Sequence, residues 1–95
     1  MNYNEIMLNN TWILGKCIGM GAFGYIYLGL NIHTNEFVAV KIEDLRVSNL
    51  LMGESRITKS MSQAGFPKYH WSGYESNNSP NYTLIMELLG PSIHD

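Results

Sequence analysis

Runs of apolar, aromatic and β-branched residues alternate with polar turns along most of the chain, and this pattern predicts β-strands. We expect five strands, at 12–19, 23–30, 37–42, 68–74 and 82–86, of which the first two form an antiparallel hairpin. In the third run, Val38, Val40 and Ile42 fall on one face, because successive side chains of a strand point to opposite sides. The other face carries Phe37, Ala39, Lys41 and Glu43. In the fourth run, Tyr69 and Trp71 are predicted to share one face.

The segment 48–61 is predicted to be a helix. Ser48 or Asn49 is expected to cap its first turn with a side-chain oxygen. Gly53 lies in the interior of this helix and costs about 1 kcal/mol relative to alanine. Contacts with the rest of the domain must therefore hold the helix in place.

A carboxylate interrupts the apolar stripe that this helix is expected to turn inward. Positions 50, 54, 57 and 61 share one stripe, and they are occupied by Leu50, Glu54, Ile57 and Met61. An unpaired carboxylate is expensive to bury, so an inward-facing Glu54 needs a cation. Lys41 is the lysine expected to face inward, whereas Lys16, Lys59 and Lys68 lie in segments expected to be exposed. The alternative is that Glu54 reaches solvent along the surface.

Gly19, Gly21 and Gly24 form a Gly-x-Gly-x-x-Gly pattern between the first two predicted strands. A backbone without Cβ atoms can approach a ligand closely and present its N–H groups to an anion such as phosphate. The aromatic and β-branched run that follows favours a strand over a helix, and the third strand carries Lys41. A glycine flap with a lysine on the strand beneath it is the arrangement of protein kinases.

The alternative interpretation of these glycines is a dinucleotide-binding turn. In that motif the glycines open a helix and an acidic residue follows about 20 positions later, a distance that Glu43 and Asp44 satisfy. The predicted strand after the glycines makes this interpretation the weaker one. The phosphate-binding loop that ends in Lys followed by Ser or Thr is absent from the sequence.

Composition limits the classes of partner. The 95 residues make one small domain, and a net charge of −2 with a pI near 5.8 argues against nucleic acid as the main partner. No apolar run approaches the roughly 20 residues of a membrane span, so no membrane partner is expected. Cys17 is the only cysteine, which suits the cytosol or nucleus. The three histidines share no metal-ligand spacing, so we expect no metal site in the chain.

The two ends of the chain have different expected roles. Residues 1–11 are polar and rich in asparagine, and we expect a flexible lead-in to a domain that occupies 12–95. Ser92 and Asp95 have the spacing of a helix start. Because no helix follows, we expect the chain to be a truncated form of a longer protein.

The sequence resembles the N-terminal lobe of a protein kinase, and in particular that of the casein kinase 1 family of Ser/Thr kinases. Three stretches carry the resemblance: the glycine loop and strand at 18–29, the Val-Ala-Val-Lys strand at 38–41, and Met-Glu-Leu-Leu-Gly-Pro-Ser at 86–92. The last stretch is similar to the hinge of that family almost residue for residue. The resemblance covers about 12–95 and implies an α+β fold, with a five-stranded antiparallel sheet and one helix of the αC type.

The resemblance also implies a set of site residues. Lys41 would hold the α- and β-phosphates of ATP and pair with Glu54 of the helix, and Met86 would be the gatekeeper beside the adenine. The glycines at 19, 21 and 24 would cover the phosphates. The adenine and ribose would be contacted by Ile18, Ile26, Ala39, the backbone of Glu87 and Leu89, and the region of Ser92 and Asp95.

ATP with Mg²⁺ is the cosubstrate that the resemblance implies, with acidic or pre-phosphorylated proteins as acceptors. The stretch between Lys41 and Glu54 is one residue shorter than is usual in that family, and Thr58 stands where the family usually has tyrosine. Kinase chemistry needs an aspartate as base and an Asp and an Asn as metal ligands. Asp44 and Asp95 are the only aspartates, and neither has a His-Arg-Asp or Asp-Phe-Gly context.

We therefore expect the 95 residues to be inactive as an enzyme by themselves. The other hypothesis is a non-catalytic lobe that acts as a binding or self-association module. Under that hypothesis, the exposed hinge and helix surface would form a homo-oligomer.

Overall fold

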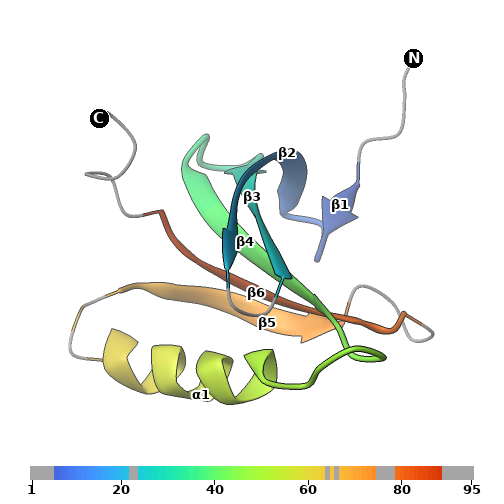
Figure 1. Ribbon diagram of the computed structural model, residues 1–95. Helices are drawn as coiled ribbons and strands as arrows, with labels where there is room; N and C mark the ends of the chain where they lie inside the picture. The colour runs from blue at the N-terminus through green and yellow to red at the C-terminus, as the bar shows by residue number, and fades with distance from the viewer. Residues whose placement is uncertain (1–5, 22–23, 64, 66, 75–78, 89–95) are drawn as a thin grey trace.

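The computed structural model describes residues 6–21, 24–63, 65, 67–74 and 79–88. Within them the chain forms one antiparallel sheet and one helix, α1 (Leu51–Ser62) (Figure 1). The spatial order of the strands is β1-β2-β3-β4-β6-β5, and every neighbouring pair is antiparallel. The strands are β1 (Met7–Leu8), β2 (Trp12–Gly21), β3 (Gly24–Asn31), β4 (Phe37–Asp44), β5 (Tyr69–Tyr74) and β6 (Asn81–Glu87).

All five predicted strands are present, and the sheet has one more than predicted. The additional strand is β1, in which Met7 lies opposite Ile13 of β2. Leu8 is almost fully buried and belongs to the same core cluster as Trp12. The prediction of five strands is therefore corrected to six, because burial of Leu8 holds two residues of the segment 1–11 against the sheet.

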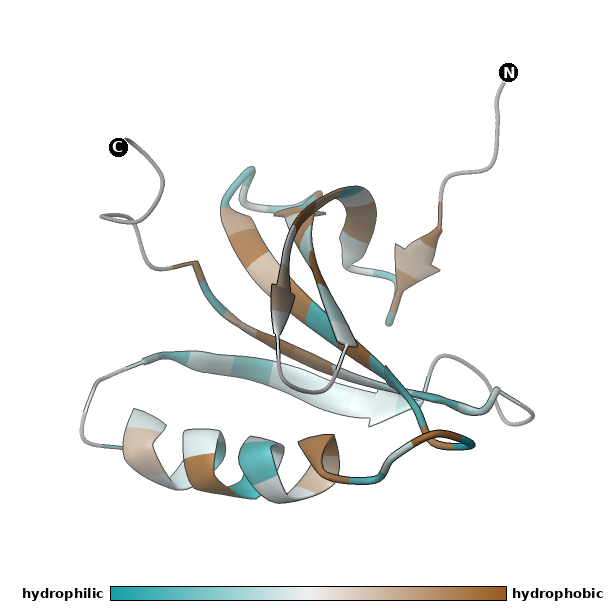
Figure 2. Cartoon of the chain, in the orientation of Figure 1, coloured by the Kyte–Doolittle hydropathy of each residue, from teal (hydrophilic) through white to brown (hydrophobic). Residues whose placement is uncertain are grey.

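The sheet has a core cluster on each face, and the predicted alternation along β4 decides which of its residues enter each cluster. Val38 and Val40 lie in the cluster with Leu8, Trp12 and Ile85. Ala39 lies on the opposite face, where α1 packs against β5 and β6 (Figure 1). That second cluster contains Ala39, Leu51, Tyr82, Leu84 and Met86. Figure 2 shows apolar colour along much of the central strands β4 and β6, while the edge strand β5 is largely pale.

The prediction that Tyr69 and Trp71 share a face is wrong. Tyr69 lies opposite Met86 of β6. Trp71, two residues later, lies opposite Ile85, which is the immediate neighbour of Met86. This register shift is a β-bulge, in which two residues of one strand oppose one residue of its partner. The bulge at His70 turns the strand, so Tyr69 packs on the helix side and Trp71 on the other.

The inward stripe predicted for the helix is also wrong by one position. The buried residues of α1 are Leu51, Ser55 and Thr58, which share a face one residue further along the chain. The apolar residues of the predicted stripe are exposed, at 58% for Leu50, 62% for Ile57 and 48% for Met61. Leu51 is completely buried, and its packing in the cluster with Leu84 decides the rotation of the helix.

Among the described residues, no helix is long and apolar enough to cross a membrane.

Candidate functional site

A lysine and a glutamate from the two layers of the domain meet at the centre of the candidate site. Nζ of Lys41 on β4 donates a hydrogen bond to Oε2 of Glu54 on α1 at 2.5 Å. The two side chains are 26% and 25% exposed, so the pair is largely buried. The predicted pairing of Glu54 with Lys41 is confirmed, and the alternative of a solvent-facing Glu54 is wrong. Lys16, Lys59 and Lys68 are exposed, as predicted.

The pairing is present although the stripe from which it was predicted is exposed. Glu54 lies beside Ser55, at the border between the buried and exposed faces of α1. The border position lets its carboxylate reach sideways to Lys41. Its second oxygen, Oε1, is buried and has no hydrogen-bond partner among the described residues. One acceptor of the pair is therefore available to a donor from outside these residues.

Two hollows of about 260 Å³ each adjoin at the lysine. We call the first the lysine hollow; it is lined by Gly21, Gly24, Ile26, Lys41, Ile42, Leu51 and Glu54. We call the second the apolar hollow; it is lined by Ile18, Gly19, Ile26, Ala39, Lys41, Met86, Glu87 and Leu88. Ile26 and Lys41 line both hollows, so a ligand that occupies one extends directly into the other. An apolar slot that continues into a charged one suits a ligand with a flat apolar part and an anionic part.

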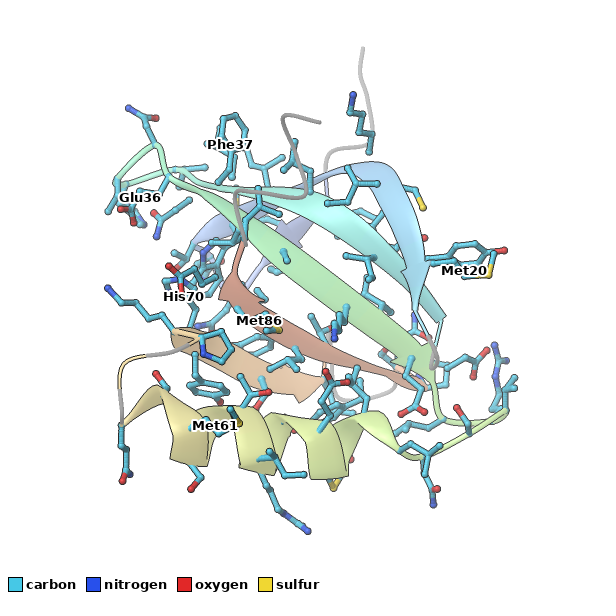
Figure 3. The ribbon with its side chains drawn as sticks, turned by 60° about the vertical axis from the view of Figure 1, so that its left-hand side comes forward. Met20, Glu36, Phe37, Met61, His70 and Met86 are labelled. Carbon is cyan, nitrogen blue, oxygen red and sulfur yellow. The ribbon has the colours of Figure 1, made fainter. Side chains whose placement is uncertain are left out.

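The sheet register explains why these residues meet. Ile26 of β3 lies opposite Lys41 of β4, and Ala39 of β4 lies opposite Met86 of β6. Together with β2, which supplies Ile18 and Gly19, four adjacent strands thus contribute residues to the apolar hollow, on the face that also carries α1. In Figure 3, Met86 lies near the middle of the sheet, while Met20 projects at the far end of the β2–β3 hairpin.

The three glycines of the loop differ in what a side chain would meet at their positions. Gly24 has a φ of +145°, and a Cβ there would lie 2.7 Å from the carbonyl oxygen of Ile42. A Cβ at Gly21 would make an ordinary contact, 3.5 Å from Cδ1 of Ile26. A Cβ at Gly19 would meet nothing within 4 Å. Of these three positions, the fold therefore needs glycine only at 24. Gly19 and Gly21 line the two hollows without side chains.

The sequence-based reasoning missed Glu43 as a residue of the site. Its carboxylate is fully buried and accepts hydrogen bonds from the backbone N–H of Leu50 at 2.9 Å and of Leu51 at 2.8 Å. It also accepts a hydrogen bond from the hydroxyl of Ser48. Burial by itself would raise the pKa of Glu43, but these three hydrogen bonds outweigh burial, and the pKa lies below its usual value of 4.5.

Glu43 thereby replaces the predicted helix cap. The prediction of Ser48 or Asn49 as the cap is wrong, since α1 begins without a side-chain cap from the preceding residue. The Ser48 hydroxyl instead donates to Glu43. The signal was present in the sequence, because the alternation along β4 places Glu43 on the same face as Lys41, toward the helix.

The remaining predicted contacts lie outside the described residues or add further lining residues. Leu89, Ser92 and Asp95 are outside the described part of the chain. Leu88 lines the apolar hollow, and Leu51 and Ile42 line the lysine hollow, although the sequence reasoning named none of the three as a ligand contact. In the described segments, no group of three or more His, Cys, Asp and Glu side chains is placed to hold a metal ion.

A third hollow, of about 270 Å³, shares Glu87 and Leu88 with the apolar hollow. Its lining includes Glu36, Phe37 and His70, which Figure 3 shows gathered together. Burial is the main cause that lowers the pKa of His70 from its usual value of 6.5. Because Lys68 and Glu87 also line this hollow, it is polar and lacks the apolar slot of the site around Lys41.

Comparison with solved structures identifies the fold. No family model matches the chain. The crystal structure of the kinase domain of PF14_0431, from Plasmodium, superposes with a TM-score of 0.69 over 96% of this chain, at 25% sequence identity. It is one of 231 chains of solved structures that match. The chain has the fold of a protein-kinase N-lobe.

This N-lobe spans 28% of the kinase domain that it matches. The predicted α+β class, with an antiparallel sheet and one helix, is confirmed. In this N-lobe, α1 has the place of the αC-type helix that was expected, and its Glu54 meets the strand lysine. Lys41, Glu54 and the glycines thus lie together, and their roles toward a nucleotide remain predictions.

Proposed function

We propose that the chain is the ATP-binding lobe of a casein kinase 1-like Ser/Thr protein kinase. The observation that carries the proposal is the Lys41–Glu54 pair at the junction of the two hollows. Lys41 would hold the α- and β-phosphates there, with its position fixed by Glu54. The casein kinase 1 part of the proposal is supported by the sequence at 86–92, which resembles the hinge of that family.

The apolar hollow has the residues that adenine needs. Ile18, Ile26, Ala39 and Met86 supply apolar walls, and Glu87 lies at the hinge edge, where backbone groups would bond the base. These are all the predicted adenine contacts that fall within the described residues. The open space beside Gly19 fits a ligand, since the chain itself places nothing within 4 Å of a Cβ at that position.

The lysine hollow has the residues that phosphate needs. The backbones at Gly21 and Gly24 approach the hollow without side chains, and Lys41 supplies a positive charge. Mg-ATP, when bound, supplies the phosphoryl group and the metal charge that phosphoryl transfer requires. The described residues of this chain contribute binding and orientation of the nucleotide.

Phosphoryl transfer to protein Ser or Thr is proposed only for an enzyme that combines such a lobe with a catalytic loop. Transfer requires an aspartate that accepts the hydroxyl proton and an Asp and an Asn that hold Mg²⁺. Neither Asp44 nor Asp95 has the sequence context of these groups. We propose that the 95 residues alone bind ATP weakly, with a dissociation constant of about 1 mM or higher, and transfer no phosphate.

An ATP titration of the ¹⁵N-labelled chain followed by NMR tests the proposal. We expect the shift changes to concentrate at the amides of Ile18, Gly19 and Ala39. Substitution Ala39→Leu should abolish them, because the larger side chain fills the apolar hollow. The matched control is Gly53→Ala, which adds a methyl group on an exposed part of α1 where a Cβ meets nothing within 4 Å. Shift changes that persist in Ala39→Leu, or that occur only elsewhere, would refute the proposed site.

A second proposal is self-association through α1. Leu50, Ile57 and Met61 share one stripe of the helix and are all about half exposed or more. Large apolar side chains aligned on one face favour burial against a partner surface. A second copy of the chain offers the same stripe and would bury it symmetrically.

A further inference from the structure

We infer that Glu43 is a positioning residue, which fixes α1 against β4 so that Glu54 meets Lys41. The consequence of this positioning, a lysine and a glutamate already paired for a nucleotide, rests on the proposed function. The geometry itself concerns the folded chain without any ligand.

Two links join the same strand to the same helix. Glu43 receives the N–H groups of Leu50 and Leu51 at the first turn of α1. Lys41, two residues earlier on the same face of β4, donates a hydrogen bond to Glu54. Two residues of a strand span about 6.8 Å, and the three residues from Leu51 to Glu54 rise about 4.5 Å along a helix. The two links therefore lie about one helical turn apart along α1, and both connect the helix to the same face of β4.

The apolar contacts of α1 with the core are few, made by the buried Leu51 and the partly buried Met52. Leu51 is the only fully apolar side chain among the three buried residues of the helix, since the others are Ser55 and Thr58. Packing of small polar side chains resists sliding and rotation less than interdigitated apolar ones. Directed hydrogen bonds therefore have a larger share in holding this helix, and those to an ionised acceptor are the stronger kind.

Two other polar contacts join α1 to the sheet. The Ser55 hydroxyl is 3.1 Å from the Tyr82 hydroxyl, and the Ser62 hydroxyl accepts the N–H of Tyr69 at 2.9 Å. These contacts hold the middle and the end of the helix. Glu43 alone among these groups holds the start of α1, on the N-terminal side of Glu54, whereas Ser55 holds the side that follows Glu54. We therefore expect loss of Glu43 to release the N-terminal side of Glu54.

Zero-length carbodiimide cross-linking of the 95-residue chain measures the contact directly. The reagent joins a lysine amine to a carboxylate in contact with it, and mass spectrometry of the digest quantifies the Lys41–Glu54 product without nucleotide. We expect Glu43→Gln to lower the yield about tenfold, because the amide cannot accept all the hydrogen bonds of the carboxylate. The matched control is Asp44→Asn, since Asp44 pairs with Arg46 at the surface and should not affect the yield.

A second substitution separates positioning from simple helix stabilisation. Gly53→Ala removes a glycine from α1 and so strengthens the helix, and its new Cβ meets nothing within 4 Å, so no hydrogen bond of Glu43 is lost. If Glu43 positions the helix, the yield stays low in Glu43→Gln/Gly53→Ala while helix content and stability recover. Recovery of the yield along with stability would overturn the inference, as would an unchanged yield in Glu43→Gln. Comparing Gly53→Ala with the double variant keeps the test valid if Glu43→Gln alone does not fold.

A variant of Ser48, which donates a hydrogen bond to Glu43, tests the same role independently. Ser48→Ala removes one of the three hydrogen bonds to Glu43 and leaves its charge. We expect a smaller loss of cross-link than in Glu43→Gln, and an equal or larger loss would contradict the assigned role. Absence of ATP binding in the NMR titration would refute the proposed function and leave this result standing, because no nucleotide takes part.

Discussion

Gly19→Ala and Gly24→Ala should have opposite effects on the stability of this N-lobe, although both change a glycine of the same motif. At Gly24, alanine would place a Cβ 2.7 Å from the Ile42 carbonyl oxygen and would adopt a φ of +145°. At Gly19, the new Cβ would meet nothing within 4 Å, and φ is not positive. The first change strains the fold, whereas the second reduces the conformational entropy of the unfolded chain.

The magnitudes follow from these geometries. A non-glycine residue held in a sparsely populated conformation costs about 1–3 kcal/mol, to which the overlap at 2.7 Å adds. We expect Gly24→Ala to lower the free energy of unfolding by about 2–4 kcal/mol and Tm by about 10–25 °C for a domain of this size. Gly19→Ala should raise the free energy of unfolding by about 0.4–1 kcal/mol.

Thermal and urea unfolding followed by the fluorescence of Trp12 and Trp71 provides the assay, since both tryptophans pack at the core on one face of the sheet. ATP binding is then measured by the NMR titration. Gly19→Ala should weaken binding about threefold or more while the fold is intact, because Gly19 lines the apolar hollow and an added methyl group there would compete with the ligand for space. Equal destabilisation by the two substitutions, or unchanged nucleotide affinity in Gly19→Ala, would show that the assignment of separate roles to these glycines is wrong.

Three further predictions concern the charged pair, the buried carboxylate and the exposed helix face. Lys41→Met should lower the free energy of unfolding by about 0.5–1 kcal/mol by breaking the pair with Glu54. Because the 95 residues are proposed to bind ATP only weakly, the same substitution should change ATP affinity less than about twofold. Tight binding that depends on Lys41 in the NMR titration would contradict this. Because the pKa of Glu43 is lowered from 4.5, its contribution to stability is present above pH 4.5 and is lost as pH falls below it. Urea unfolding of Glu43→Gln should accordingly show reduced stability near neutral pH and a weaker pH dependence below 4.5; an unchanged pH profile would exclude this role. Ile57→Lys should abolish concentration-dependent self-association in sedimentation velocity, and wild-type chain that stays monomeric at high micromolar concentration would count against that association.

Local patterns were sufficient for the features that depend on neighbouring residues. The alternation along β4 placed Val38 and Val40 on one face and Ala39 and Lys41 on the other, because a strand has a period of two. The glycine pattern placed the β2–β3 hairpin correctly, since the residues after it favour a strand. The charge argument for Glu54 also held, because a largely buried carboxylate needs a cation wherever the stripe around it points.

Features that depend on distant partners were predicted wrongly or missed. The bulge at His70 arises from the register between β5 and β6, which the alternation of one strand cannot show. The phase of α1 depends on which side chain finds space in the core, and Leu51 took that place instead of Leu50. β1 was missed because two residues carry no periodicity of their own.

The sequence by itself determined five of the six strands, the glycine hairpin and the lysine and glutamate that pair, because period, turn chemistry and the cost of an unpaired charge act locally. Only the tertiary structure decided that Glu43 accepts hydrogen bonds at the start of α1 and that Leu51 lines the lysine hollow with Gly21 and Lys41. These contacts join residues far apart in the chain, and their geometry follows from strand register and helix rotation, which are properties of the packed domain.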